Sequence, residues 1–335
     1  MIDGRISIVM PVYNAGRYLQ AAIQSVLNQK YTDFEIIAVN DGSKDNSLEI
    51  LQSFSDPRLH IINKENTGVS DTRNVAIENA NGEYVCFLDA DDCLSPDYLK
   101  RMYGTAKEKN ADMVVCNYHT FRDKPNFDNN RNVAIRVENT KILVQAGVLT
   151  SAWTKLIKLS ILSKYHILFD KNMTFGEDLF FCWKAYLASE NIWMIDEKLY
   201  GYRMTGVSAT SKYHPALYEK YKYAFFELKQ FGRKISKDDE YAMDVFFATR
   251  MPSFIRMTIR ENSSFSAKRK RLLLILNDKT IQKVFDDWNS FSSEIQPRET
   301  ALYEKCKGKR VVWLLVDGYK KETILFIKNK IKELS

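Results

Sequence analysis

The chain has 335 residues, of which 45% are apolar and 27% are charged, with a formal net charge of +7. This is the composition of a globular protein with one large domain or two modest ones, and 13 Gly and 7 Pro are too few for a collagen-like or low-complexity chain. No apolar run reaches the ~20 residues that a membrane span needs, and no signal-peptide pattern opens the sequence, so we expect a cytoplasmic protein.

The first third of the chain alternates short apolar segments with amphipathic ones. The apolar segments predict strands, and the segments between them predict helices whose apolar side chains form one stripe. We expect strands at Ile6–Val9, Phe34–Val39, Leu59–Ile62, Tyr84–Leu88 and Met113–Cys116, and helices at Arg17–Gln29, Ser47–Phe54, Gly68–Asn79 and from Pro96 onward. This alternation is typical of a mostly parallel sheet flanked by helices, so the expected class is α/β.

The pattern changes twice further along the chain. The pattern loosens over residues 119–137, where 122–131 predict a polar loop. Short strands at 192–195 and 199–202 then complete a first domain that we place at residues 1–213. Residues 214–335 predict a mainly helical second region, with a strand at 310–316 and a last helix at 321–334. Five cysteines without metal-binding spacing predict reduced, mostly buried thiols.

Positive charge is concentrated in the second region. Residues 1–214 carry 24 Lys+Arg and 26 Asp+Glu, a net of −2, whereas residues 215–335 carry 25 and 16, a net of +9. This asymmetry suggests contact with an acidic membrane surface, a phosphate-bearing acceptor or nucleic acid; the alternative is a solvated basic surface. The basic residues Lys268–Arg271, followed by the apolar run 272–276, fit a peripheral membrane contact, a helix start with a buried end, or a contact in a homo-oligomer.

Polar residues follow four of the predicted strands, at the edge where open parallel sheets bind their ligands. These segments are Pro11-Val12-Tyr13-Asn14, Asn40-Asp41-Gly42-Ser43, Lys64-Glu65-Asn66-Thr67-Gly68 and Asp89-Ala90-Asp91-Asp92. The three carboxylates of the last segment repel one another unless a cation or hydrogen-bond donors compensate them. Carboxylate oxygens suit Mg²⁺ or Mn²⁺, so this segment predicts a divalent cation site, against the alternative of a solvated acidic turn.

Two glycine-rich nucleotide motifs are absent from the sequence. No GxGxxG follows the first predicted strand, and no GxxxxGK[ST] occurs anywhere. This argues against a dinucleotide-binding Rossmann domain and against a P-loop NTPase. A nucleotide bound at this edge would therefore need a metal that carboxylates hold.

The order and spacing of these segments resemble those of family 2 glycosyltransferases with the GT-A fold. The resemblance covers about residues 4–212 and includes Thr72-Arg73-Asn74 and the strand that precedes the acidic segment. Further along, Gly176-Glu177-Asp178 is similar to the acidic acceptor-side motif of the family, and Trp153-Thr154-Lys155 and Tyr202-Arg203 are similar to blocks of its bacterial members. The resemblance says little about residues 215–335.

The resemblance implies an inverting enzyme that moves a hexose or N-acetylhexosamine from a nucleotide-diphospho-sugar, most often a UDP-sugar, to a hydroxyl group of a glycan, lipid-linked or protein-linked acceptor. Nucleic acid is not an expected partner. The donor-binding residues carried over by position are Pro11, Val12, Tyr13, Asn14, Asp41, Asn66, Gly68, Arg73, Asp89, Ala90 and Arg203. Asp91, with Asp89, would hold Mn²⁺ or Mg²⁺, which stabilises charge on the leaving diphosphate.

The resemblance also implies where the acceptor is activated. A hydroxyl nucleophile needs a base on the face of the sugar opposite the leaving group. Asp178 takes this role, with Glu177 as the second choice, and the alternative is a carboxylate that only stabilises a helix N-terminus. Arg203 would close over the diphosphate from a segment that contains Gly206 and Ser208.

Several alternatives stay open at the level of sequence. Arg73 has the alternative of an ion pair on its own helix, Tyr13 that of packing at the sheet edge, and Trp153 is either a sugar platform or part of the core. For the whole chain, the competing hypotheses are a nucleotidyltransferase and a non-catalytic binding or scaffolding member of the family. The expected location is the cytoplasm, including the inner face of the membrane.

Overall fold

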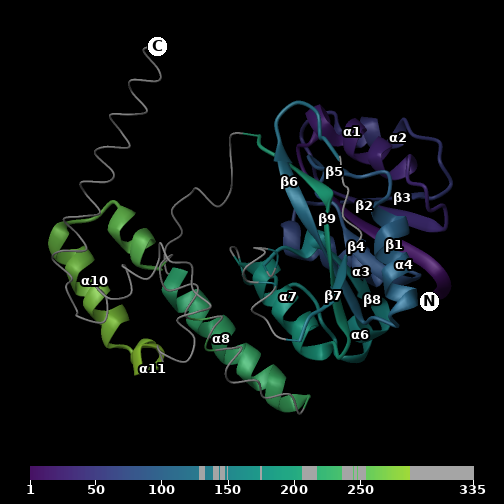
Figure 1. Ribbon diagram of the computed structural model, residues 1–335. Coiled ribbons are helices and arrows are strands. Elements are labelled where there is room, and N and C mark those ends of the chain that lie inside the picture. The colour runs from purple at the N-terminus through teal and green to yellow at the C-terminus, as the bar shows by residue number, and fades with distance from the viewer. Residues whose placement is uncertain are drawn as a thin grey trace. The chain divides into compact units, whose positions relative to one another are not determined.

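The computed structural model of the chain describes residues 1–127, 133–138, 143, 148, 150–173, 176–205, 217–235, 244, 247 and 254–286. The chain divides into two compact units (Figure 1). The first consists of Met1–Ser208 and Phe231–Lys237, and the second of Ala209–Gln230 and Asp238–Ser335. The domain boundary expected at residue 213 stays a prediction.

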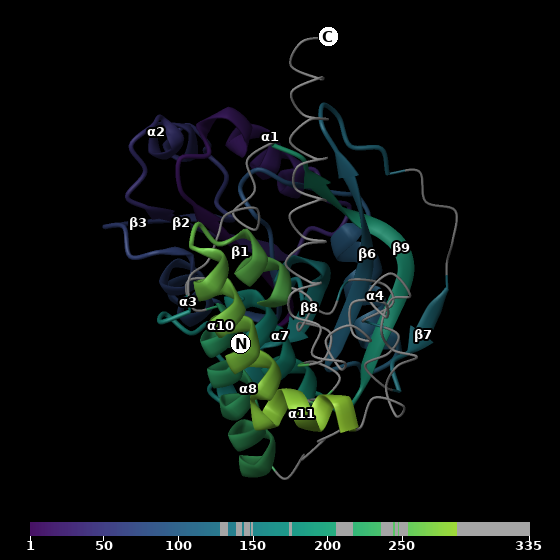
Figure 2. The ribbon, with the colours of Figure 1, turned by 90° about the vertical axis from the view of Figure 1, so that its left-hand side faces the viewer.

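Within the described residues, the first unit is built around one nine-stranded sheet. The order of hydrogen-bonded strands is β3-β2-β1-β4-β8-β6-β9-β5, and β7 pairs with β9 outside this path. The strands are β1 (Ile2–Val12), β2 (Phe34–Asp41), β3 (Leu59–Lys64), β4 (Gly82–Phe87), β5 (Cys93–Leu94), β6 (Met113–Phe121), β7 (Ala134–Arg136), β8 (Lys155–Lys158) and β9 (Ile192–Arg203). Figure 2 shows the long strands β6 and β9 side by side.

The strands pair in both directions. Parallel pairs join β1 to β2 and β4, β2 to β3, and β6 to β9. Antiparallel pairs join β8 to β4 and β6, and β9 to β5 and β7. The α/β class is therefore confirmed, and the expected parallel arrangement holds for β3-β2-β1-β4 and for β6–β9. The direction changes at β8, which runs opposite to both of its neighbours.

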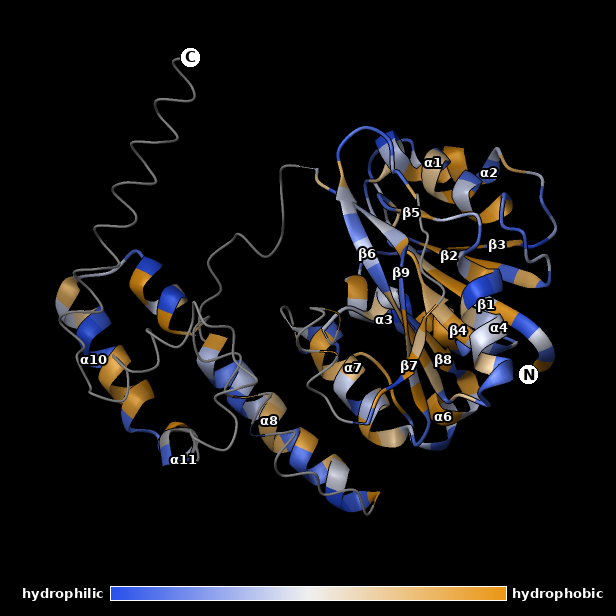
Figure 3. Cartoon of the chain, viewed as in Figure 1, coloured by the Kyte–Doolittle hydropathy of each residue, from blue (hydrophilic) through white to orange (hydrophobic). Residues whose placement is uncertain are grey.

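Helices cover the sheet of the first unit. They are α1 (Gly16–Leu27), α2 (Ser47–Gln52), α3 (Val69–Glu78), α4 (Tyr98–Glu108), α6 (Leu159–Lys164) and α7 (Glu177–Ala188), with a 3₁₀ turn, η1, at Ala152–Thr154. In α1 the buried residues are Leu19, Ala22, Ile23 and Val26, which is the stripe that the sequence predicts. Strand β2 is buried along its whole length, as a strand covered on both faces requires, and Figure 3 shows the apolar character of the central strands in orange.

The strands that precede the polar segments end at one edge of the sheet. In the parallel register, Val12 of β1 pairs with Asn40 of β2, and Asp41 pairs with Lys64 of β3. On the other side of β1, the N–H of Leu88 donates to the Val9 carbonyl at 3.0 Å. The four polar segments singled out in the sequence therefore leave the sheet next to one another.

Residues 122–127 lie outside the strands, between the end of β6 at Phe121 and the start of β7, which agrees with the polar loop expected at 122–131. One expectation about the strands is wrong. The strands expected at 192–195 and 199–202 are one strand, β9. Its charged middle is compatible with a sheet because Asp196 accepts a hydrogen bond from Asn117 Nδ2 at 2.9 Å and Glu197 forms an ion pair with Arg101 at 2.5 Å.

The described part of the second unit is helical. It includes most of α8 (Leu217–Lys234), a helical segment at 254–260, α10 (Phe265–Asn277) and α11 (Lys279–Asp286). Lys268 in the basic start of α10 is buried and donates to the Ile259 carbonyl at 2.7 Å. The strand expected at 310–316 and the helix expected at 321–334 lie outside the described residues. In the part of the chain that the structure describes, no helix combines the length and the apolar content of a membrane span.

Candidate active site

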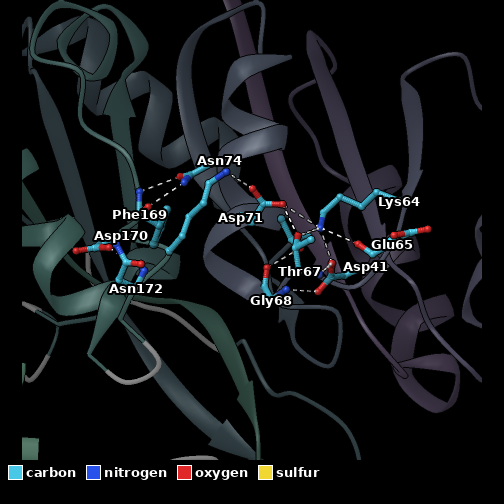
Figure 4. Close-up of polar contacts among 12 residues, drawn as sticks. Asp41, Lys64, Glu65, Thr67, Gly68, Asp71, Asn74, Phe169, Asp170 and Asn172 are labelled. Carbon is cyan, nitrogen blue, oxygen red and sulfur yellow. Dashed lines mark hydrogen bonds and ion pairs between the residues drawn. The ribbon is translucent and has the colours of Figure 1, made fainter.

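Asp41, the last residue of β2, is held in a cradle of hydrogen bonds. Its carboxylate accepts from the backbone N–H groups of Thr67 at 2.9 Å and Gly68 at 3.0 Å, and from Lys64 Nζ at 2.5 Å (Figure 4). Gly68 has φ +95°, a backbone region that glycine enters without strain. Burial alone would raise the pKa of Asp41, but the three donors outweigh it and lower the pKa below its ordinary value. Asp41 is therefore ionised and fixed in direction.

The loop after β1 is joined to the loop after β2. The N–H of Asn14 donates to Ser43 Oγ at 3.0 Å, and Asn14 Oδ1 accepts from the N–H of Lys44 at 2.8 Å. Tyr13, next to this junction, is 52% exposed, which argues against its packing at the sheet edge and leaves its ring open to a ligand. Val12 has no exposed surface, so its side chain supports the loop from the core and does not line a pocket.

The acidic turn after β4 is clamped to β9. Asp92 accepts hydrogen bonds from Tyr200 Oη at 2.6 Å and from the N–H of Arg203 at 2.7 Å. Tyr200 Oη also accepts from the N–H of Asp89 at 3.3 Å. Burial, together with the charges of Asp89 and Asp91, raises the pKa of Asp92 to about 8. Asp92 is therefore the carboxylate that holds the turn in shape, and Ala90 within the turn is likewise buried.

Asp89 and Asp91 are the remaining carboxylates of the turn, and they fit a divalent cation. Among the side chains that the structure describes, none donates a hydrogen bond to the Asp91 carboxylate, whereas burial and the charge of Asp89 raise its pKa to about 6. A desolvated carboxylate beside a like charge is stabilised by a cation. In the described ranges no group of three or more His, Cys, Asp or Glu side chains could hold a metal ion. A cation here would therefore need water and diphosphate ligands, which is the usual mode for Mg²⁺.

Arg73 of α3 connects the acidic turn to the start of α7. Its Nη2 donates to Asp89 Oδ1 at 2.9 Å and its Nη1 to Asp178 Oδ1 at 2.5 Å, while Glu177 Oε1 lies 3.7 Å from Nη1. Its side chain is only 6% exposed. Burial alone would lower the pKa of Arg73, but the three carboxylates raise it above its ordinary value. The alternative of an ion pair within its own helix is wrong, because all of these partners lie outside α3.

Asp178 lies in the first turn of α7, which begins directly after Gly176 in a left-handed conformation with φ +83°. Its side chain is 24% exposed. Burial raises the pKa of Asp178 to about 7, because the lowering effect of Arg73 is opposed by the charges of Glu177 and Asp89. A carboxylate that titrates near neutral pH and is partly open to solvent is suited to accept a proton from a substrate.

The block at residues 153–155 supports the site from the core. Trp153 is 9% exposed and stacks on Tyr200, the clamp of the acidic turn, with ring centroids 4.5 Å apart. Lys155 is 1% exposed, and its Nζ donates to the backbone carbonyl of Ser151 at 2.6 Å. Burial lowers the pKa of Lys155. These contacts favour the core interpretation of Trp153 over that of a sugar platform.

Arg203 lies at the end of β9 and braces the acidic turn. Its Nε donates to the backbone carbonyl of Asp91 at 2.7 Å and its Nη1 to that of Arg122 at 3.2 Å. In this structure the guanidinium therefore holds the backbone of the acidic turn in place. Its contact with a diphosphate stays a prediction, and Gly206 and Ser208, expected to form part of a lid, lie outside the described residues.

The structure brings most of the expected site residues to one edge of the sheet. They form a donor-side group around Asp41, with Asn66 Nδ2 donating to the Asp41 carbonyl at 3.0 Å, and an acidic group connected by Arg73. Pro11 is half-buried at the end of β1. Three contributors had no role assigned from the sequence, namely Lys64, Thr67 and Tyr200. The first two lie in the same polar segment as Asn66, so the sequence near the site indicates them. Tyr200 is 111 residues from Asp89, and nothing in the sequence around it indicates a contact with the acidic turn.

A sheet edge with an ionised carboxylate after one strand, an acidic turn after another and a separate carboxylate across a shared arginine is the arrangement of a GT-A transferase. The sequence agrees with this class. Residues 7–180 match the model of glycosyl transferase family 2, which is more than half of the chain, and the chain belongs to this family.

Named relatives agree with this assignment, and a solved structure agrees with the fold. The chain is 33% identical over 220 residues to the glycosyltransferase GlyA of Streptococcus pneumoniae, covering 61% of this chain and only 31% of GlyA. It is 30% identical over 253 residues to the uncharacterized glycosyltransferase EpsJ of Bacillus subtilis, covering 71% of both. S. aureus TarS 1–349, solved in complex with UDP-GlcNAc, has a TM-score of 0.71 at 20% identity over 95% of this chain and 92% of that one, which supports the fold.

Proposed function

We propose that this chain is a metal-dependent inverting glycosyltransferase that moves a hexose or N-acetylhexosamine from a UDP-sugar to a hydroxyl group of a glycan, lipid-linked or protein-linked acceptor. The family supports a glycosyl transfer. TarS, which shares the fold, has been solved with UDP and with UDP-GlcNAc, and this favours a uridine donor.

On the donor side, Asp41 is the group that recognises the base. It is ionised and held by three donors, and its Oδ2, which accepts from the Gly68 N–H, can also accept the N–H of uracil. The exposed ring of Tyr13 is available to cover the base or ribose. Together these two residues account for binding of the nucleoside part.

The leaving diphosphate needs positive charge. Asp89 and Asp91 would hold Mn²⁺ or Mg²⁺, and the ion would stabilise the negative charge that grows on the diphosphate. Asp92 does not share this task, because Tyr200 and Arg203 occupy its oxygens. The clamp instead keeps the turn rigid, so that the two ligand carboxylates are preorganised.

On the acceptor side, Asp178 takes the hydroxyl proton. The acceptor oxygen forms a bond to the anomeric carbon while the bond from that carbon to the diphosphate oxygen breaks, and the proton passes to the Asp178 carboxylate. This single displacement inverts the anomeric centre. Arg73 keeps Asp178 in place before the acceptor arrives.

One observation carries the proposal: a single guanidinium, that of Arg73, contacts both Asp89 at 2.9 Å and Asp178 at 2.5 Å. The metal-side carboxylate and the proposed base therefore lie within the reach of one side chain, which is compatible with both acting on one bound donor sugar.

The test is a donor panel. The purified chain is incubated with UDP-, GDP- and dTDP-sugars in Mn²⁺, and slow release of the nucleoside diphosphate is followed. We expect a UDP-sugar to be hydrolysed fastest. A nucleotidyltransferase would instead release pyrophosphate from a nucleoside triphosphate and a sugar phosphate, and a non-catalytic member would bind UDP without turnover. The role of the second unit and the location in the cytoplasm or at the inner membrane face stay predictions.

A further inference from the structure

Helix α3 connects the donor side of the site to the segment that leads to the proposed base. Its N-terminus begins at Gly68, in the cradle of Asp41. Along its length, α3 contacts the chain at residues 169, 171 and 178, and Figure 4 shows the contact between Asn74 and Phe169. These contacts are Asp71 to Lys171, Asn74 to Phe169 and Arg73 to Asp178.

Asn74 makes the most constrained of these contacts. It is 2% exposed, its Nδ2 donates to the Phe169 carbonyl at 2.8 Å, and its Oδ1 accepts from the Phe169 N–H at 2.8 Å. Two hydrogen bonds from one side chain to both polar groups of one residue fix its position and its orientation. Because Phe169 engages both the nitrogen and the oxygen of the Asn74 amide, this amide serves the backbone and not a donor or acceptor molecule in this structure.

The ring of Phe169 packs against α7. It stacks on Phe181 with centroids 4.0 Å apart and planes 5° apart, and Phe87 packs edge-on against both rings at 5.6 and 5.4 Å. Phe181 lies three residues after Asp178 on α7, which places the two on neighbouring positions of one helix face. Phe87 lies two residues before Asp89. The aromatic cluster therefore fills the space between the elements that carry the two carboxylates.

We propose that Asn74 is a positioning residue for the base: by holding Phe169 it sets the place of the first turn of α7, and with it the distance from Asp178 to Asp89. The inference rests on the proposed function, because it takes Asp178 as the base and Asp89 as a metal-side carboxylate. Close packing makes the position of α7 sensitive to the backbone of Phe169. A displacement of about 1 Å at a reacting group can reduce a rate about 100-fold.

The kinetic test compares Asn74→Ala with the wild type, using the donor that the panel shows to be hydrolysed fastest. We expect the rate to fall about 10- to 100-fold, while the Kd of UDP with Mn²⁺ stays within about twofold. In the Asp178→Asn background, Asn74→Ala should change the residual rate by less than about twofold, since there is no base left to position. Equal slowing in both backgrounds would mean a general structural role and would overturn the proposal.

The matched control is Asn191→Ala. Asn191 also holds the backbone with its side-chain amide, since its Nδ2 donates to the carbonyls of Lys109 at 2.7 Å and Asn110 at 3.0 Å, but it lies before β9, at the end opposite to Arg203. We expect this variant to lose thermal stability without losing the rate per folded molecule. If it slows turnover as much as Asn74→Ala does, the effect is not specific to the path through Phe169.

Hydrogen exchange tests the same inference without any substrate. Asn74→Ala should speed exchange at the amides of 169–173 and of the first two turns of α7, and leave α1 and β2 as protected as in the wild type. Unchanged exchange in α7 would overturn the proposal. If Asn74→Ala does not fold, Asn74→Asp carries both tests, because it has the same size and still accepts from the Phe169 N–H. If Asp178→Asn retains the full rate, the proposed base is wrong, and the exchange result still decides whether Asn74 positions α7.

Discussion

Replacing Asp178 by asparagine should slow transfer by about 10²- to 10⁴-fold, the usual effect of removing a general base. At about 1.4 kcal/mol for each factor of ten, this is a loss of about 3–5.5 kcal/mol of transition-state stabilisation. Asparagine keeps the size of the side chain and one acceptor oxygen, but it cannot take up the hydroxyl proton.

Donor binding should survive this change. Arg73 loses one ion pair but keeps Asp89 at 2.9 Å and Glu177 at 3.7 Å, so its buried charge is not left without a carboxylate. Among the described residues, Asp178 pairs with Arg73 and not with Asp41 or Asp91, so the surroundings of these two aspartates do not change. We therefore expect the Kd of UDP in Mn²⁺, measured by calorimetry, to stay within about twofold of the wild-type value, while the transfer rate falls by the factor given above.

Glu177→Gln is the matched control, since it removes the neighbouring charge from the same helix turn. Its carboxylate lies 3.7 Å from Arg73, compared with 2.5 Å for Asp178, so we expect a rate loss below about tenfold. If Glu177→Gln abolishes transfer and Asp178→Asn retains most of it, the two roles are exchanged. If neither variant changes the rate, the acceptor is activated elsewhere and the proposed mechanism is refuted.

Four further outcomes are expected. Asp91→Asn should weaken UDP binding in Mn²⁺ but not in EDTA; equal UDP affinity of the wild type under both conditions would contradict the metal site. Because burial raises the pKa of Asp178 to about 7, kcat/KM should rise with pH up to about 7, and this limb should vanish in Asp178→Asn. The same shift means that the folded state binds this proton more tightly than the unfolded chain. Protonation of Asp178 therefore stabilises the folded state fully below about pH 4, and this contribution is lost as pH rises through about 7. The Tm of Asp178→Asn relative to that of the wild type should therefore increase from pH 5 to 8, and a constant difference would refute this. Ser264→Ala should lower the free energy of unfolding by about 1 kcal/mol in denaturant titrations, because the Ser264 hydroxyl accepts from the N–H of Ala267 at the start of α10; no change would show that this cap is unimportant.

The part of the site nearest the parallel strands was predictable from sequence. The register of parallel strands makes their ends meet, so residues that directly follow them, such as Asp41 and Asp89, are bound to lie at one edge. Buried apolar runs such as 34–39 identify the strands without tertiary information. Local signals of this kind located the donor side without reference to any partner far along the chain.

The remaining part depends on pairings that have no local signal. Strand β8 has four residues, with a lysine at each end, and owes its place to antiparallel pairing with β4 and β6. Asn74 and Phe169 are 95 residues apart, so nothing near Asn74 indicates its partner. Arg203 was expected at a diphosphate because a loop arginine offers no sign of the backbone carbonyls that it meets at the end of β9.

A comparison of two aspartates supports the functional interpretation of the acidic cluster. Asp56 and Asp178 each form a close ion pair with an arginine, but burial has the largest effect on the pKa only at Asp178. The pairing with Arg58 lowers the pKa of Asp56 to about 2, as expected for a structural ion pair. Burial raises the pKa of Asp178 to about 7 in spite of Arg73, since Arg73 is shared with Asp89 and Glu177. Crowding several carboxylates around one guanidinium costs stability that a fold could avoid with neutral side chains, so stability does not explain it. The arrangement is explained by the need for a base that is held in place and can still take up a proton near neutral pH.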